Sequence, residues 1–326
     1  MRLRKRHSHA AALVGVVAAA LFASAAVADS HGSAPPSSPA ALQRTITSAL
    51  KVNALPSLLS PSLAAIASLG AGHFAGASWL LGKGCGPNGN DAFDPCPAYF
   101  GLKSATRTIV VFGDSFVSNW LPALNIAAKV LRVRFAAFEF SGCVTPFVPQ
   151  PPFAGFPEAD VQLCNEWHHN LPAAVIKLRP LAVIAANGSP EGWPVGDSEW
   201  VAGLKLAFQE MTPGASKTPR ILLGAGPHFT TPAPACLAAY PTAIQSCTLT
   251  YTPGSSSSFG AALLRDEAAV RAANAVLIPT AQWMCARDRC PTVVGERLVY
   301  LDADHISISY SEFLSAVLLK VLAKAI

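Results

Sequence analysis

The stretch 107-RTIVVFGDSFVSNW-120 decides the fold that this sequence predicts. Its apolar run 108-TIVVF-112 is rich in β-branched residues and is typical of a buried strand. Gly113 permits a sharp turn, and the residues after Ser115 have helical spacing. A strand, a glycine turn and a helix in this order indicate a parallel sheet covered by helices. Ser115 then lies at the carboxyl end of a strand, where such sheets place their sites.

The alternation of strand and helix continues to the end of the chain. We predict strands at 133–140, 181–186, 220–225 and 275–280, and helices at 118–131, 166–178, 198–211, 259–275 and 309–326. Pro172 is expected to limit the start of the second of these helices. The fold class is therefore α/β, with a parallel sheet of about five strands and helices on both faces.

The first 28 residues have the pattern of an export signal. Four basic residues within positions 2–6 precede an apolar run at 10–23, and small residues end at Ala28. This order predicts a secretory signal peptide at 1–28, cleaved after Ala28, and hence a secreted or periplasmic protein. An uncleaved anchor is the alternative, although the run is shorter than the ~20 residues that a bilayer span needs.

The rest of the chain is almost electrically neutral. Removal of the four basic residues of the signal peptide from the 24 in the chain leaves 20 Lys and Arg residues against 19 Asp and Glu residues. This balance provides no basic patch, so we expect no nucleic-acid partner.

Three further segments follow the signal peptide. Residues 29–40 form a Ser/Pro linker, 41–104 a helical extension and 105–326 the α/β domain. The extension should contain short amphipathic helices at 41–51 and 61–70.

Eight cysteines all lie beyond the signal peptide. An even number in an exported chain indicates disulfides, and the spacing favours neighbours among the 105 possible pairings. The predicted pairs are Cys85–Cys96, Cys143–Cys164, Cys236–Cys247 and Cys285–Cys290. Zinc is the alternative, but it usually requires close Cys-x-x-Cys or Cys-x-x-His pairs, which the sequence lacks. We therefore expect no metal site and no cofactor.

The tripeptide Gly-Asp-Ser occurs a second time, in 191-EGWPVGDSEWVAGL-204. This copy follows Pro194 and has no strand directly before it. Asp197 or Ser198 is well placed as the N-cap of the next helix, so that Ser198→Ala should cost only about 1 kcal/mol of stability. Ser115 is therefore the candidate nucleophile of the two.

A nucleophilic serine needs a base, and the base needs an acceptor that orients it. Asp302 and His305 form the only Asp-x-x-His of the chain, between the last strand and the last helix. The alternative is a loop carboxylate that caps this helix beside a surface imidazole. A metal-dependent hydrolase built on His168 and His169 is another possibility, but adjacent histidines point to different sides of a helix.

Several short blocks together resemble the SGNH/GDSL family of serine esterases and acyltransferases. They are 110-VVFGDSFVSNWLPAL-124, 141-SGCVTP-146, 232-PAPACL-237, 283-WMCARDRCP-291 and 299-VYLDADHIS-307. They look most like the SGNH domain fused to membrane acyltransferase-3 proteins, which O-acetylate bacterial surface polysaccharides, over roughly residues 45–320. The resemblance implies a flavodoxin-like three-layer α/β/α sandwich, in agreement with the alternation described above.

The resemblance also implies roles for individual residues. Ser115 would be the nucleophile, His305 the general acid/base and Asp302 the residue that orients it. The oxyanion donors would be Ser115 itself, Gly142 after the second strand and Asn187 after the third, all at strand ends, as such donors should be. Asn187 could instead form a turn with Gly188, and Gly142 could serve close backbone packing.

Some features depart from the family pattern. A His often follows the serine directly, but here the residue is Phe116, and the usual Gly-x-Asn-Asp block around the oxyanion asparagine is absent. No multi-helix membrane domain accompanies the motifs, so we expect a separate membrane protein to supply the acyl group.

The predicted function is an exported serine acyl-transfer enzyme, an O-acyltransferase or an esterase, acting on O-acyl esters of cell-surface carbohydrate. The substrate is expected to be a carbohydrate or an acyl ester. Trp193 and Trp283 lie in loops near the expected site and could stack on a sugar ring, although such residues are often core side chains. The alternative is a non-catalytic carbohydrate-binding module, which predicts a damaged triad.

Overall fold

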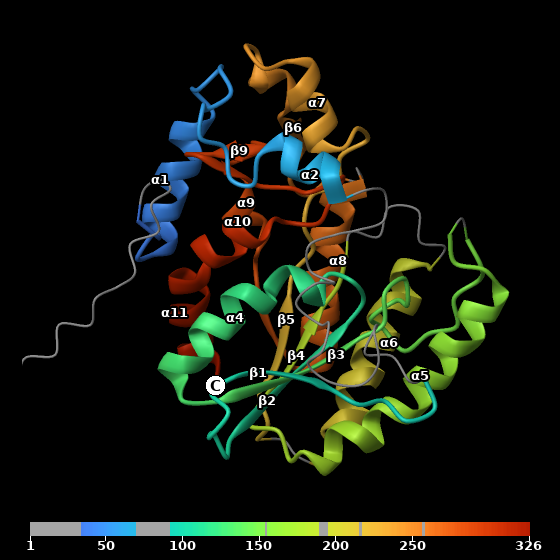
Figure 1. The fold of residues 1–326 in the computed structure, drawn as a ribbon. Helices are drawn as coiled ribbons and strands as arrows, with labels where there is room; N and C mark the ends of the chain where they lie inside the picture. Colours follow the sequence, from blue (N-terminus) through green and yellow to red (C-terminus); the bar gives the residue numbers. More distant parts are fainter. Residues whose placement is uncertain (1–33, 70–91, 154, 189–194, 215–216, 256–257) are drawn as a thin grey trace, which may run out of the picture. The chain divides into compact units, whose positions relative to one another are not determined.

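The computed structural model describes residues 34–69, 92–153, 155–188, 195–214, 217–255 and 258–326 (Figure 1). These residues all belong to the unit His31–Ile326. The predicted signal peptide lies outside the described residues. No helix among the described residues is long and apolar enough to cross a membrane.

A six-stranded sheet in the order β1-β3-β2-β4-β5-β7 forms the centre of the fold. Its strands are β1 (Ala98–Gly101), β2 (Thr108–Gly113), β3 (Arg134–Glu139), β4 (Val183–Ala186), β5 (Arg220–Leu223) and β7 (Val276–Ile278). The last five are parallel, in a flavodoxin-like order with β2 between β3 and β4. The predicted parallel α/β sheet is therefore confirmed.

One edge strand was not predicted. β1 lies inside 41–104, the segment expected to be a helical extension, and pairs antiparallel with β3. A single antiparallel edge strand on an otherwise parallel sheet is common in such folds. The predicted extension thus contributes a strand to the central sheet in addition to its helices.

The helices cover both faces of the sheet. The long ones are α4 (Val117–Leu131), α5 (Glu158–Lys177), α6 (Asp197–Met211), α8 (Ser258–Ala273) and α11 (Ser315–Ala325), and the shorter ones are α1 (Pro39–Ala49), α2 (Leu63–Leu69), α7 (Ala233–Ala239), α9 (Ala281–Met284) and α10 (Ile308–Phe313). The described residues also include a 3₁₀ turn, η1 (Ile244–Cys247), and two small ribbons, β6 (Leu249–Thr250) with β8 (Arg289–Cys290) and β9 (Val293–Val294) with β10 (Arg297–Leu298).

Alternation along β2 explains the three layers. Ile109 and Val111 point into one core, which includes buried residues of α1, α4 and α11. Val110 and Phe112 point into the other, which includes buried residues of α5 and α6. Figure 1 shows α4 and α11 on one side of the strands and α5 and α6 on the other. A strand that is apolar on both faces must be covered on both faces, as the sequence predicts.

Two helix predictions need correction. α5 begins at Glu158, well before Pro172, which lies inside the helix. Its first turn carries Glu158 and Asp160, and acidic side chains there favour a helix start. The predicted closing helix is divided into α10 and α11 at Leu314.

The start of α6 also differs from the prediction. Gly196 is the N-cap, and its backbone N–H donates to the Glu199 carboxylate at 3.1 Å. Asp197 and Ser198 are already inside the helix, and Asp197 forms an ion pair with Arg265 at 3.4 Å. Ser198→Ala should therefore cost less than the loss of a cap, because Ser198 is exposed and does not cap the helix.

Three disulfides join cysteines that the sequence pairs. Their Cα–Cα distances are 5.4 Å for Cys143–Cys164, 5.7 Å for Cys236–Cys247 and 4.0 Å for Cys285–Cys290. Cys85 lies outside the described residues, so the pairing with Cys96 stays a prediction.

Gly113 should be irreplaceable for packing reasons. It has φ +145°, and a Cβ there would overlap the carbonyl oxygen of Ala186 and lie 2.8 Å from Thr145 Oγ1. We expect Gly113→Ala to destabilise the fold by at least about 2–3 kcal/mol, measured by chemical unfolding. Gly214→Ala is the matched control, because Gly214 also has a positive φ, +61°, but none of the described residues beyond its chain neighbours lies within 4 Å of the new Cβ. Equal losses in the two variants would contradict a role for close packing.

Candidate active site

Ser115, His305 and Asp302 lie in one hydrogen-bonded chain. Ser115 Oγ is 2.9 Å from His305 Nε2, and His305 Nδ1 is 2.8 Å from Asp302 Oδ2. Ser115 follows β2 by two residues, whereas the other two lie in the loop before α10, with His305 190 residues further along than Ser115. This is the order and spacing of a nucleophile, a base and a residue that orients the base.

Short contacts hold the loop that contains Asp302 and His305. The Asp302 Oδ1 atom accepts the backbone N–H groups of Asp304, at 2.9 Å, and His305, at 2.7 Å. The N–H of Leu301 donates to the His305 carbonyl at 2.8 Å. Asn119 of α4 accepts the Ile306 N–H at 3.1 Å, which ties the loop to the helix that follows Ser115. These hydrogen bonds therefore fix the backbone that positions the His305 imidazole.

Asp114 fixes the turn on which Ser115 lies. It is fully buried and accepts the N–H of Phe116 at 2.8 Å and the N–H of Gly188 at 2.9 Å. Burial raises the pKa of its carboxyl to about 7, although these two amides act in the opposite direction. Asp114 thus connects the segments that follow β2 and β4 through one hydrogen bond to each.

The segments that follow β3 and β4 lie on either side of Ser115. Gly113, at the end of β2, pairs with Glu139 of β3 and with Ala186 of β4. Gly142, after β3, has φ +80°, and a Cβ there would meet the Phe156 ring. No hydrogen-bond acceptor is present for the backbone amide of Ser115 or Gly142 among the described residues. Such amides can bind an oxyanion.

The Asn187 side chain contacts the next residue. It is buried, and its Nδ2 donates to the Gly188 carbonyl at 3.2 Å. Its Oδ1 has no partner among the described residues. This contact matches the alternative in which Asn187 forms a turn with Gly188. Its oxyanion role stays a prediction.

Charge around His305 favours its protonated form. Burial lowers the pKa of the imidazole, but hydrogen bonds to Asp302 and Asp304 and the charges of both carboxylates outweigh burial and raise the pKa to about 10. Phe116, which stands where related sequences often have His, packs on the imidazole with 4.9 Å between ring centroids. The Phe116 ring therefore packs against the imidazole of the candidate base.

Glu139 is a second buried acid below this site. Ser141 Oγ donates to its Oε1 at 3.0 Å, and its Oε2 has no partner among the described residues. Burial, together with the nearby Asp114 carboxyl, raises its pKa to about 8. Glu139 is therefore protonated at neutral pH, which reduces the free-energy cost of its burial.

Other predicted site residues lie elsewhere. Trp193 lies outside the described residues. Trp283 is 2% exposed and packs edge-to-face on Trp120, with 5.9 Å between centroids, so its predicted sugar-stacking role is wrong because the ring is in the core. His168 is buried, which lowers its pKa to about 4, and its Nε2 lies 2.8 Å from the Val144 carbonyl oxygen, an acceptor for its N–H.

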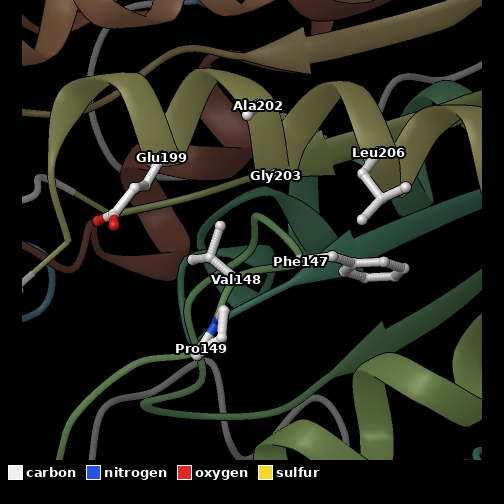
Figure 2. A pocket seen from close by; sticks show the side chains of 7 residues that line it. All are labelled: Phe147, Val148, Pro149, Glu199, Ala202, Gly203 and Leu206. Atoms are coloured by element: carbon white, nitrogen blue, oxygen red, sulfur yellow. The ribbon is translucent and has the colours of Figure 1, made fainter.

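A separate pocket of about 290 Å³ lies between α6 and the loop after β3 (Figure 2). Figure 2 shows Phe147, Val148 and Pro149 facing Glu199 and Leu206 of the helix. Its lining includes no member of the Ser115 hydrogen-bonded chain. We therefore assign it no part in the site.

The chain belongs to the SGNH domain family. The family model, described as "SGNH domain (fused to AT3 domains)", matches residues 84–320. This is a family of acyl-ester hydrolases and acyltransferases, as the sequence motifs predict, in which the SGNH domain occurs together with membrane AT3 domains. No curated protein matches the chain.

Similar solved structures include a domain that shares the fold. The periplasmic domain of a lipopolysaccharide acetyltransferase from Salmonella ser. Paratyphi A has 15% sequence identity and a TM-score of 0.50, over 68% of this chain and 85% of that one. Est24, a carbohydrate acetylesterase from Sinorhizobium meliloti, has 14% identity and a TM-score of 0.42, over 68% of this chain and 100% of that one. At 15% identity, the likeness to the lipopolysaccharide acetyltransferase domain concerns the fold alone.

Glu139 should make the fold less stable as the pH rises. Its folded pKa, about 8, lies above the ordinary 4.5, so between these values the unfolded chain releases a proton that the folded protein keeps. Its stabilising contribution is complete below pH 4.5 and is lost as the pH rises through 8. We expect the wild-type Tm to fall between pH 6.5 and pH 8, and that of Glu139→Gln to fall by less, in circular dichroism melts.

The control for this experiment is Glu210→Gln, because Glu210 is exposed on α6. The window begins at pH 6.5 because below it the buried His168, whose pKa is lowered to about 4, acts with the opposite sign. Asp114 and His305, whose pKa values are raised, act with the same sign as Glu139, so some fall in Tm should remain. Identical pH dependence of wild type and Glu139→Gln would contradict the assignment.

Proposed function

We propose that the protein is an exported serine acyl-transfer enzyme that acts on O-acyl esters, chiefly O-acetyl esters, of cell-surface carbohydrate. One observation supports this more than any other: the hydrogen-bonded chain from Ser115 Oγ through His305 to Asp302. Membership of the SGNH family agrees with it. The catalytic chemistry belongs to residues 105–326.

The reaction begins at Ser115. Its Oγ bonds to the acyl carbon while His305 Nε2 takes its proton, and Asp302 stabilises the imidazolium that forms. The backbone amides of Ser115 and Gly142 bind the carbonyl oxygen as it becomes negative. The bond to the leaving alcohol then breaks, and the imidazolium returns the proton to the leaving oxygen, which leaves an acyl group on Ser115.

The second half repeats these steps with a new nucleophile. His305 removes a proton from water or from a sugar hydroxyl, whose oxygen attacks the acyl carbon and releases Ser115. Water gives an esterase and a sugar hydroxyl gives an O-acyltransferase. The carbohydrate is proposed from the sequence resemblance and from the lipopolysaccharide acetyltransferase domain named above.

Export and an external acyl donor complete the proposal. The three disulfides favour an oxidising compartment such as the periplasm. The family's fusion to AT3 domains supports a membrane protein as the source of the acyl group. The non-catalytic binding module is disfavoured, because a module has no need of an intact Ser–His–Asp arrangement.

A fluorophosphonate probe tests the serine directly. We expect wild-type protein to be labelled on the peptide that contains Ser115, and Ser115→Ala to be unlabelled and to lose at least about 10³-fold in ester turnover. Ser198→Ala is the matched control, because Ser198 lies in the other Gly-Asp-Ser and should leave labelling intact. An unlabelled wild type that still binds a sugar would favour the non-catalytic module.

The pH profile of kcat/KM tests the base. His305 can accept the Ser115 proton only as a neutral imidazole, and the raised pKa places this form at higher pH than the ordinary 6.5. We expect kcat/KM for an acetyl ester to rise with pH along a limb that lies above pH 6.5. A limb at or below pH 6.5 would contradict the strong carboxylate interaction.

A further inference from the structure

His305 has a second carboxylate beside it. Its Nδ1 lies 3.1 Å from Asp304 Oδ1, in addition to the 2.8 Å contact with Asp302 Oδ2. The other oxygen of Asp304, Oδ2, lies 3.0 Å from Nδ1 of His228. Asp304 therefore bridges the candidate base and another histidine, which neither the Asp-x-x-His motif nor the hydrogen-bonded chain of Ser115 includes.

Backbone hydrogen bonds connect the segment that contains His228 to the loop that contains His305. It follows β5, and the N–H of Phe229 donates to the Ala303 carbonyl at 2.8 Å. The N–H of Ala233 donates to the Asp302 carbonyl at 3.1 Å. His228 and Asp304 are only partly exposed, at 31% and 21% of their side chains. Their contact is therefore part of a fixed junction between two loops.

The two carboxylates are held in different ways. One oxygen of Asp302 accepts two backbone amides, so the loop itself fixes it. The Asp304 Oδ2 atom is instead held by its contact with His228 Nδ1. Burial would raise the pKa of Asp304, but hydrogen bonds with His228 and His305 and the charges of both rings keep it well below its ordinary range. Asp304 is therefore ionised wherever His305 titrates.

From this geometry, and resting on the function proposed above, we infer that Asp304 is a second positioning residue for His305. It shares the Nδ1 proton with Asp302 and can hold the imidazole in the same tautomer when Asp302 is neutralised. His228 is the residue that keeps Asp304 in position to do so.

Other charged groups near His305 do not provide this contact. Asp114 and Glu139 interact with it through charge alone, from the β2 and β3 sides of the site. Phe116 covers a face of the ring. Among these neighbours, only Asp302 and Asp304 have an oxygen within 3.1 Å of Nδ1.

The test is a double-mutant cycle in the full-length protein, with kcat/KM measured on p-nitrophenyl acetate. Asp302→Asn keeps an oxygen for the two backbone amides but removes the charge, and we expect a loss of about 10–100-fold because Asp304 substitutes. Asp304→Asn alone should lose about threefold and should move the acidic limb of the pH profile to lower pH. The double variant should lose about 10⁴-fold, far more than the product of the single losses.

His228 is tested in the Asp302→Asn background. There, His228→Ala should remove most of the remaining activity, whereas His228→Asn should restore part of it, because its amide nitrogen can occupy the place of Nδ1. Glu267→Gln, an exposed change on α8, is the control and should change kcat/KM neither in wild type nor in Asp302→Asn. A double loss equal to the product of the single losses, or no effect of His228→Ala, would overturn the inference.

A second readout does not depend on turnover. In Ser115→Ala protein, the His305 imidazole is titrated by NMR with and without Asp304→Asn, and we expect the pKa to fall in the variant. An unchanged His305 pKa would overturn the role inferred for Asp304 but would not bear on the proposed function. The absence of both ester turnover and Ser115 labelling in wild type would instead overturn the proposed function.

Discussion

The buried carboxyl of Asp114 is the constraint on which the candidate site depends. It accepts one amide at the start of α4 and another from Gly188 after β4, so a single side chain fixes the segments that follow two neighbouring strands. Gly113 makes this arrangement possible because a side chain there would overlap the Ala186 carbonyl. Ser115 lies between these anchors, and its position follows from the backbone on either side.

The parallel sheet brings the remaining parts to the same place. The carboxyl ends of parallel strands lie at one edge, so loops that are far apart in the sequence converge there. Asn119 of α4 holds the loop of His305 against the helix that follows Ser115, and the segment of Phe229 holds its other side. The contact between Ser115 and His305 thus depends on helix, strand and loop contacts together.

Sequence periodicity predicted the five parallel strands because each contains a short apolar run. β2 and β4 are buried along their whole length, whereas Val276 of the edge strand β7 is 46% exposed. β1 was missed because its sequence, AYFG, contains no β-branched residue, and only two of its four residues are buried. The Asp302–His305 pair could be predicted because it is local in sequence. The contact of Asp304 with His228 spans 76 residues and arises only when two loops meet, so no spacing rule indicates it. Trp283 was misjudged for a similar reason, since Trp120 of another element buries it.

The central claim is that Ser115 becomes acylated during turnover. The most direct measurement is acid-quenched peptide mass spectrometry after brief mixing of the wild-type protein with an acetyl-ester donor. We expect one added acetyl group on the peptide that contains Ser115, and loss of this group when a glycan acceptor or more time is allowed. Turnover of the ester with no acetylated Ser115 peptide at any time, or acetyl on the Ser198 peptide instead, would contradict it.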